Sequence, residues 1–236
     1  MNHQSPDTLY VEETRIKAVY EKRCDGTCYS WFNRGHIFLM QELERVLLTL
    51  LAQYHLTPLQ TKQILDVGCG TGYWLREFIQ WGADPRKVMG IDLVTDRVVQ
   101  ARALCPDAVR IDCGSAAQLA FSDATFDLVT QFTVFTSVLD FDMKQRIAAE
   151  MRRVVKPDGV ILWYDYYVNN PWNPDVRGIP KREIAQLFPG CRLDLRRVTL
   201  VPPVARFLAP YSWLLCYALA RLPYCCTHYL GVIQTR

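Results

Sequence analysis

The sequence predicts an α/β fold, in which a mostly parallel sheet of seven strands carries helices on both faces. Two observations predict it. From residue 62 onward, short apolar runs alternate with helical runs, which is typical of repeated strand–helix units. A glycine-rich turn, GCGTG at residues 68–72, joins the first apolar run to a helix. Right-handed crossovers would bring the ends of the parallel strands to one edge of the sheet.

Two helices precede the sheet and form a helical cap over residues 1–60. The first is expected around residues 8–23. In the second, over 35–54, apolar residues recur at helical spacing. Between them, CDGTCYSWFN (24–33) is aromatic and polar and contains Gly26, so it predicts a loop.

The core of the sheet is expected over residues 61–168. The KPDG segment at 156–159 predicts a turn into the fifth strand. The strand-like runs are QILDV, KVMGIDL, VRIDC, FDLVTQF and VILWYDYY, and the helical runs between them are YWLREFIQWG, DRVVQARAL and MKQRIAAEMRRVV.

The pattern loosens after Tyr167, so residues 169–236 are expected to form a substrate-side loop, an insert and the last strands. A short helix (180–188) and a strand (CRLDLRRVTLV, 191–201) precede a proline-punctuated apolar insert at 202–223, and HYLGVIQT (228–235) is the final strand. Helices of the insert can belong to the core, or they can shape an apolar substrate pocket or a homodimer face.

Composition and charge restrict the class of protein to which this chain can belong. The chain has 236 residues, 50% hydrophobic and 22% charged, which suits a single folded domain with a sizeable core. Its net charge is only +3. A nucleic-acid-binding protein usually carries a stronger basic excess on one face, so we expect no nucleic-acid partner.

The cysteines and the terminal segments indicate a cytoplasmic protein. Nine cysteines occur without a repeated CxxC pair, which predicts reduced thiols and no metal site. The first residues, MNHQSPDTLYVEE, lack the pattern of a signal peptide. The apolar run at 207–220 is shorter than the roughly 20 residues that span a bilayer. We therefore expect no membrane span, although the run allows an interfacial helix.

The glycine turn points to a nucleoside-bearing cofactor. Gly68, Gly70 and Gly72 allow a sharp turn and close approach of a ligand to the backbone. A dinucleotide site prefers a third glycine at position 73, where this chain has Tyr73. The pattern therefore disfavours NAD and leaves the identity of the cofactor to the acidic residues nearby.

Two aspartates narrow the choice of cofactor. Asp66, two residues before the first glycine, would repel a pyrophosphate and attract an ammonium group. Asp92 ends the second strand, where a carboxylate accepts hydrogen bonds from ribose hydroxyls. A ligand with a ribose, an ammonium and no phosphate fits both: S-adenosylmethionine, whose product is S-adenosylhomocysteine.

An ordered set of motifs then resembles the class I S-adenosylmethionine-dependent methyltransferases, which have a Rossmann-like fold. The set is ILDVGCGTGYWL, GIDL, AAQLAFSDATFDLVTQFTVFTSVLD and RVVKPDGVILWYD, over residues 62–165. By position, the resemblance implies that the methionine part meets Asp66, Gly68, Gly70 and Gln131, the ribose meets Asp92, and the adenine meets Leu93, Ser115 and Ala116. Ser115 stands where the family often has an acid, and Ser137 where many relatives have a histidine.

Two residues are candidates for a catalytic base. His36 begins the second helix, beside the aromatic loop, where it can also act as a cap or surface residue. Asp165 ends the fifth strand on the cofactor edge, where it can hold the substrate or cap the following loop. A base would accelerate transfer by about 10²–10⁴-fold if the acceptor is a hydroxyl or a protonated amine.

Four further residues are candidates for substrate contact. Tyr29 and Trp31, with Tyr20 and Phe32, can form a lid or pack between the cap and the sheet. Tyr166 lies beside Asp165, on the opposite face of the strand. Arg177 can clamp a substrate anion or lie on the surface.

These residues predict a methyltransferase acting on an oxygen or nitrogen atom of a small molecule, by in-line displacement at the sulfonium methyl. A secondary metabolite, a sugar or a lipid-linked precursor would fit as acceptor. An alternative is a methyltransferase-like binding subunit without turnover, which the changes at Ser115 and Ser137 allow. An NAD-dependent oxidoreductase is a third, disfavoured by Asp66 and Tyr73.

Overall fold

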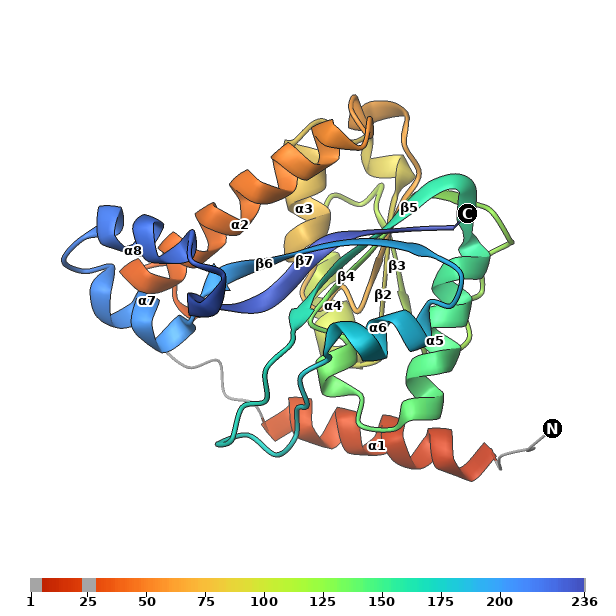
Figure 1. Ribbon diagram of the computed structural model, residues 1–236. Coiled ribbons are helices and arrows are strands. Elements are labelled where there is room, and N and C mark those ends of the chain that lie inside the picture. Colours follow the sequence, from red (N-terminus) through yellow and green to blue (C-terminus); the bar gives the residue numbers. More distant parts are fainter. Residues whose placement is uncertain (1–5, 23–28, 236) are drawn as a thin grey trace.

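The computed structural model describes residues 6–22 and 29–235, and it has the predicted α/β architecture (Figure 1). Seven strands form one sheet in the order β3-β2-β1-β4-β5-β7-β6. The strands from β1 to β5 are parallel, and β7 is antiparallel to both β5 and β6. The fold class is confirmed. The strands are β1 (Ile64–Val67), β2 (Val88–Asp92), β3 (Arg110–Cys113), β4 (Phe126–Phe132), β5 (Val155–Tyr166), β6 (Arg192–Leu200) and β7 (Cys226–Gln234).

Helices cover both faces of the sheet. One face packs against α2, α3 and α4, and the opposite face packs against α1, α5 and α6. Their bounds are α1 (Pro6–Lys22), α2 (Arg34–Gln53), α3 (Tyr73–Gln80), α4 (Thr95–Leu104), α5 (Phe141–Val154) and α6 (Lys181–Leu187). Side chains alternate between the two cores along each strand, so Ile64 faces one core and Leu65 the other.

The N-terminal cap divides into two helices on opposite faces of the sheet. The expected break at Gly26 lies outside the described residues. Helix α2 begins where Asn33 accepts hydrogen bonds from the backbone amides of Gly35 and His36, at 3.0 and 3.1 Å. Such a cap satisfies amides that have no partner within the helix. Helix α1 lies below the sheet in Figure 1, across the start of α5, and it packs through Ile16 on the same core as α5 and α6.

The expected turn at KPDG is a bulge inside β5. Phe126 of β4 pairs with Val155, whereas Leu128 pairs with Val160, so the residues between leave the ladder and the pairing resumes. Gly159 lies at the return, where an added Cβ would be 3.0 Å from the carbonyl oxygens of Phe126 and Asp127. The prediction of a plain turn before the strand was wrong because β4 holds both sides of the segment.

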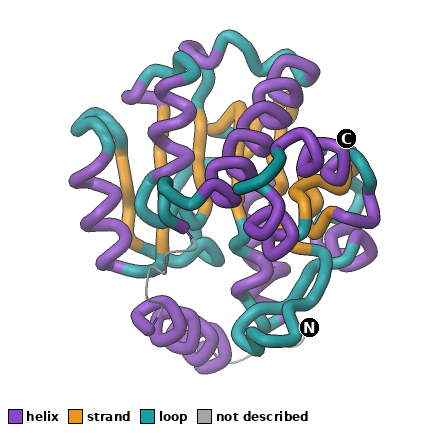
Figure 2. The backbone as a smooth tube through the Cα atoms, turned by 90° about the vertical axis from the view of Figure 1, so that its left-hand side faces the viewer, coloured by secondary structure: helices purple, strands orange, loops and turns teal. Residues whose placement is uncertain are grey.

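The apolar insert consists of α7 (Pro202–Leu208) and α8 (Trp213–Ala220), and it packs on the first half of α2. It projects from the end of the sheet at which β6 ends and β7 begins. The last residue of the parallel strand β5, Tyr166, pairs with His228 near the start of β7, so β5 ends at this same edge. The insert therefore lies at the carboxyl edge, where the parallel strands end. Figure 2 looks at the molecule from this side. Within residues 6–22 and 29–235, no helix is long and apolar enough to cross a membrane.

Candidate cofactor and acceptor site

The glycine turn after β1 has the backbone shape that its sequence predicts. Gly68, Gly70 and Gly72 have φ angles of 71°, 54° and 75°, a region that other residues rarely adopt. At Gly68 an added Cβ would also collide with Cγ2 of Val134, in the loop after β4. Glycine is therefore needed at position 68 both for its backbone angle and for the close packing of the two loops.

Asp92 joins this turn to the next one. Its Oδ2 accepts a hydrogen bond from the amide of Gly70 at 2.8 Å, and its Oδ1 accepts one from Val94 at 2.9 Å. The side chain is nearly buried but still lines the pocket at the carboxyl edge. Since each carboxylate oxygen accepts more than one hydrogen bond, Asp92 can hold two backbone turns and still receive ribose hydroxyls.

A pocket opens at this edge beside Gly68 and Asp92. Of the other predicted cofactor residues, Leu93, Ser115 and Ala116 line it as well. Its remaining walls come from α1, β2, the start of α4, the loop after β3, the end of β4 with the loop that follows it, and α5, and they are Ile16, Tyr20, Ile91, Val94, Arg97, Gly114, Phe132, Thr133, Val134, Ser137, Val138, Met143 and Ile147.

Helix α1 supplies a wall of the pocket that is far from the glycine turn in sequence. The Tyr20 ring lies under the guanidinium of Arg97, with 4.3 Å from Cζ to the ring centroid. Its hydroxyl is 2.8 Å from Oγ of Ser137. Ser137 thus lines the pocket at the position where relatives have a histidine, and its hydroxyl is paired with α1.

Two charged residues anchor α1 to the loop before α5. Glu12 accepts hydrogen bonds from the amides of Leu139 and Asp140 and from the guanidinium of Arg15. Arg15 in turn donates to the carbonyl oxygen of Ser137 at 2.6 Å. Although burial opposes its charge, these donors hold the pKa of Glu12 below its ordinary value. The carboxylate therefore stays ionised and keeps α1 in place at neutral pH.

Asp66 lies beneath the glycine turn and is almost fully buried. Its Oδ1 accepts a hydrogen bond from the hydroxyl of Thr130 at 2.7 Å. Burial raises the pKa of Asp66 to about 7, and the negative charge of Asp92 adds to this effect. A nearby cation would lower that pKa again, as the ammonium of a bound methionine group would.

Gln131 holds the loop after β4. Its side-chain amide donates to the carbonyl oxygen of Tyr164 at 3.3 Å and accepts from the amide of Val134 at 3.1 Å. It is fully buried and does not line the pocket. The side chain therefore shapes the loop, and a contact between Gln131 and the methionine group stays a prediction.

His36 lies outside the pocket, in an aromatic row on the α2 side. Its ring is 5.2 Å from Trp31 and 6.0 Å from Tyr29, centroid to centroid. The row continues as Trp31 stacks on Tyr73 at 5.7 Å. Two further contacts extend it to the pocket wall, from Tyr73 to Trp74 at 4.9 Å and from Trp74 to Phe132 at 4.2 Å. Burial and the charge of Arg206 lower the pKa of His36 below its ordinary value of 6.5.

Asp165 lies on the face of β5 opposite to Tyr164 and Tyr166, and it supports the loop after β4. It is fully buried, and its oxygens accept from the amides of Thr136 and Tyr166 at 3.1 and 2.9 Å. Burial raises the pKa of this carboxyl to about 7. The sequence left open a substrate contact or a cap of the following loop, but the oxygens instead bind backbone at Thr136, in the loop after β4, and at Tyr166, and neither lines the pocket.

Tyr166 belongs to an aromatic stack at the end of β5. Its ring is 3.7 Å from His228, whose other neighbour, Tyr164, lies parallel at 4.6 Å. Burial lowers the pKa of His228 to about 3, so the imidazole is neutral at physiological pH. No local sequence pattern predicts this stack, because His228 and Tyr166 meet only through the antiparallel pairing of β5 and β7.

Arg177 is paired within the protein. Its guanidinium donates to Glu183 at 2.7 Å, and the same carboxylate oxygen is 2.8 Å from the buried ammonium of Lys144. Its backbone amide binds the carbonyl oxygen of Thr136 at 2.9 Å. Arg177 thus ties the loop before α6 to the loop after β4, and clamping of a substrate anion stays a prediction.

The pocket also includes residues outside the motifs of the sequence. Arg97 lies in the first turn of α4, which follows Asp92, and Phe132 ends β4 with Thr133 and Val134 directly after it, so these residues had a positional signal. Ile16 of α1 had none, because it reaches the pocket only through tertiary packing.

Residues 64–159 match a family model described as a methyltransferase domain. This segment contains the glycine turn, Asp92 and the end of β4, which together line the pocket. It is a class I S-adenosylmethionine-dependent methyltransferase domain. The prediction of this family, and of S-adenosylmethionine as its cofactor, is confirmed for that part of the chain.

A named relative of this methyltransferase domain is the ubiquinone biosynthesis O-methyltransferase of Azorhizobium caulinodans. It is 34% identical over 110 residues, which are 45% of this chain and 41% of the relative. The chain spans about half or less of the length of the curated relatives it matches.

Solved structures share the fold over nearly the whole chain. The 1,6-didemethyltoxoflavin-N1-methyltransferase of Burkholderia thailandensis, solved with bound 1,6-didemethyltoxoflavin and S-adenosylhomocysteine, has a TM-score of 0.64 and 16% identity. The alignment covers 100% of this chain and 93% of that one. The [4+2]-cyclase SpnF has a TM-score of 0.63 and 17% identity, over 97% of this chain and 94% of that one. The fold thus extends beyond the matched segment, to α1 and the last strands.

Replacement of Asp92 by alanine tests its role in holding the cofactor. We expect Asp92→Ala to raise the dissociation constant of S-adenosylhomocysteine by about tenfold or more, because hydrogen bonds to a charged group contribute about 1.5–3 kcal/mol each. Isothermal titration measures it. Asp112→Ala is the matched control, since Asp112 on β3 pairs with Arg110 outside the pocket. An unchanged constant in Asp92→Ala would rule out the role.

The buried Asp66 predicts a pH dependence of stability. Its pKa is about 7 in the folded protein and 3.8 ordinarily, so between these values the folded state binds more protons than the unfolded state. Its contribution to the free energy of unfolding is therefore fully present below pH 3.8 and is lost as pH rises to about 7. Urea unfolding of the ligand-free protein across this range should give a smaller pH-dependent loss in Asp66→Asn. Identical pH profiles in the two proteins would contradict the assignment.

Proposed function

We propose that this chain transfers the methyl group of S-adenosylmethionine to an oxygen or nitrogen atom of a small molecule, which would be a secondary metabolite, a sugar or a lipid-linked precursor. The single observation that carries the proposal is the pocket in which Asp92 faces the glycine turn. Its walls suit the parts of the cofactor: a carboxylate for the ribose, and apolar Ile91, Leu93 and Ala116 for the adenine.

Alignment of the reactants is the main task of such a site. The sulfonium methyl is already electrophilic, so the acceptor atom needs only to be held in line with the carbon–sulfur bond. Positioning of this kind contributes about 7–11 kcal/mol to lowering a barrier. The rigid support of the loop after β4, through Gln131 and Asp165, favours this function because the loop forms the pocket wall nearest the end of β4.

The acceptor would enter on the α2 side of the pocket. Phe132 is shared by the pocket wall and the aromatic row that leads to Trp31 and His36. Tyr164, also on this side, has its ring 6.0 Å from that of Phe132, and it leads to His228 and Tyr166. Flat aromatic walls and two imidazoles suit an acceptor with an apolar or aromatic body and one polar atom to be methylated.

A second candidate function is cofactor binding without methyl transfer. Ser137, at the position of the family's histidine, is paired with Tyr20 and is not a base. The [4+2]-cyclase of similar fold illustrates that this architecture also serves other reactions. Under this alternative the pocket would still take up S-adenosylmethionine, but product would not form.

A binding and turnover experiment separates these functions. Isothermal titration should give micromolar binding of S-adenosylhomocysteine and none of NAD, because Tyr73 begins α3 where a dinucleotide site needs its third glycine. Radiolabelled S-adenosylmethionine with a panel of phenols, amines and sugars should then yield a labelled product. Binding without product from any acceptor would favour the binding subunit. Absence of S-adenosylhomocysteine binding would overturn both readings.

His36→Ala tests the proposed base. With the best acceptor of the panel, turnover should fall about 100-fold or more while the dissociation constant of S-adenosylhomocysteine stays unchanged. Since the pKa of His36 lies below 6.5, the wild-type rate should persist as pH falls to that value, and it should drop only below it. His55→Asn, at the exposed end of α2, is the control. Full activity in His36→Ala would assign the residue to the aromatic packing.

A further inference from the structure

The outer surface of the insert is almost entirely apolar. Among residues 202–225 the exposed side chains are Pro203, Val204, Phe207, Pro210, Tyr211, Leu214, Leu215, Ala218, Arg221, Leu222, Pro223 and Tyr224, and of these only Arg221 is charged. Exposure is high at Phe207 (71%), Tyr211 (81%), Leu214 (80%) and Tyr224 (90%). We call this the insert face.

The insert face is not the packing side of the insert. The opposite side already has its partner, because Ala205, Ala209 and Cys216 are buried against Phe38 and Leu39 of α2. Helix α8 reads WLLCYALA, with no charged residue on any side. A helix that is apolar all round is normally covered all round. Here one side is covered by α2 and the other is open, which marks an interaction surface.

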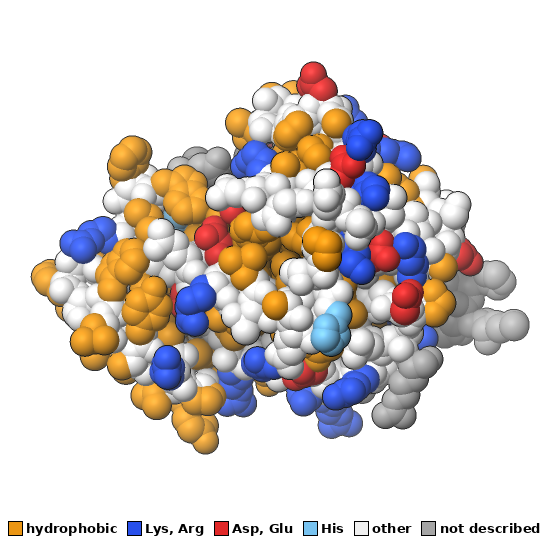
Figure 3. All heavy atoms as spheres, turned by 90° about the horizontal axis from the view of Figure 1, so that it is seen from above, with side chains coloured by type: hydrophobic (Ala, Val, Ile, Leu, Met, Phe, Trp, Pro, Cys, Tyr) orange, Lys and Arg blue, Asp and Glu red, His pale blue; other side chains and the backbone are white. Residues whose placement is uncertain are grey.

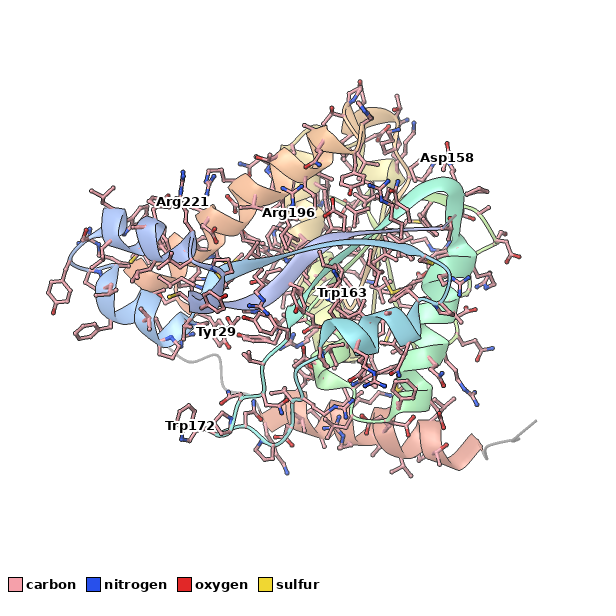
Figure 4. All side chains as sticks on the ribbon, viewed as in Figure 1. Tyr29, Asp158, Trp163, Trp172, Arg196 and Arg221 are labelled. Carbon is pink, nitrogen blue, oxygen red and sulfur yellow. The ribbon has the colours of Figure 1, made fainter. Side chains whose placement is uncertain are left out.

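Basic residues surround the insert face, and acidic residues are absent from its segments. Neither residues 29–41 nor residues 195–236 contain an aspartate or a glutamate. Arg34 is exposed at the start of α2 and donates to the carbonyl oxygen of Pro210 at 2.9 Å. Arg221 extends from the end of α8 (Figure 4). In Figure 3 hydrophobic side chains gather at the insert end of the molecule, with Lys and Arg side chains among them.

More exposed aromatic residues lie on the same side of the molecule. Phe32, directly before the cap of α2, is 96% exposed, and Trp172 in the loop after β5 is 88% exposed. Figure 4 shows Tyr29 and Trp172 on the side toward which the insert projects. Aromatic side chains with a nearby arginine are typical of surfaces that enter the headgroup region of a bilayer, where the rings lie at the water boundary.

We propose that the insert face docks the protein on the surface of an anionic phospholipid bilayer. The exposed apolar residues enter the headgroup region, and Arg34 and Arg221 meet lipid phosphates. The contact is interfacial and crosses no bilayer. Because the insert lies at the carboxyl edge, beside Tyr166 and His228, docking would bring the acceptor side of the pocket close to the lipid. This last step rests on the proposed function and implies an acceptor with a lipid part.

The charge pattern favours lipid over a second copy of the chain. A two-fold dimer through the insert face would place the same surface on both sides of the contact. The arginines of one copy would then lie near those of the other, with no acidic residue of the segment to pair with them. Phosphate-rich headgroups supply the missing opposite charge.

Vesicle sedimentation tests the proposal. The full chain should sediment with mixed phosphatidylcholine–phosphatidylglycerol vesicles and far less with phosphatidylcholine alone. The double variant Phe207→Glu/Leu214→Glu should bind the mixed vesicles with an affinity lower by about tenfold or more, because it removes apolar contact and adds negative charge. Arg221→Gln should weaken binding to the anionic vesicles by about fivefold, the usual effect of one basic residue. Val99→Glu, at an exposed apolar position of α4, is the control and should bind like wild type.

Three outcomes would overturn the proposal. One is a wild-type chain that binds neither kind of vesicle, and another is equal loss in Val99→Glu. The third is a wild-type dimer, measured by light scattering, that Phe207→Glu/Leu214→Glu turns into a monomer without any vesicle binding, which would assign the face to a second copy. Titration of S-adenosylhomocysteine into each variant shows that the fold is intact, and it separates failure of docking from failure of the proposed function.

Discussion

The carboxylate of Asp92 is the interaction on which the site depends. It joins two turns that follow different strands, through the amides of Gly70 and Val94. The carbonyl oxygen of Ile91 accepts hydrogen bonds from the amides of Gly68 and Cys69 at 2.8 and 3.0 Å, so the turn is also hydrogen-bonded to the end of β2. A turn of glycines has much conformational freedom to lose on folding. These bonds fix its shape before any ligand arrives, which lowers the ordering cost of binding.

The loop after β4 is supported in the same way, by buried polar side chains that bind its backbone. Gln131 accepts from the amide of Val134, and Asp165 accepts from the amide of Thr136. Burial of such groups is costly unless their hydrogen bonds are satisfied, and here the backbone satisfies them. Asp165, a candidate base from the sequence, therefore belongs to the support of the loop, while the acceptor side is mostly aromatic.

The local sequence pattern was sufficient to predict the sheet and the glycine turn. Strand and helix periodicity predicted each strand, and the spacing of the glycines and Asp92 predicted a pocket, which Gly68 and Asp92 line while the amide of Gly70 binds the carboxylate of Asp92. Long-range contacts could not be predicted in this way. Tyr20 and Ser137 are 117 positions apart, and nothing near either residue indicates their bond. The bulge at KPDG likewise depends on pairing with β4, which local turn propensity does not contain.

Because Glu12 and Arg15 attach α1 beside the pocket, binding of a ligand in the pocket and docking of α1 on the domain are linked. Because Ile16 and Tyr20 form part of its wall, filling the pocket adds contacts to α1, and seating α1 adds contacts to the ligand. Linkage requires the two effects to be equal in free energy. A molecule that bound the exposed Tyr10 and Val11 of α1 more tightly when the helix is seated than when it is not would therefore raise the affinity for the cofactor from a distance. The helix gives the domain a place where its occupancy can be adjusted without any change to the cofactor contacts themselves.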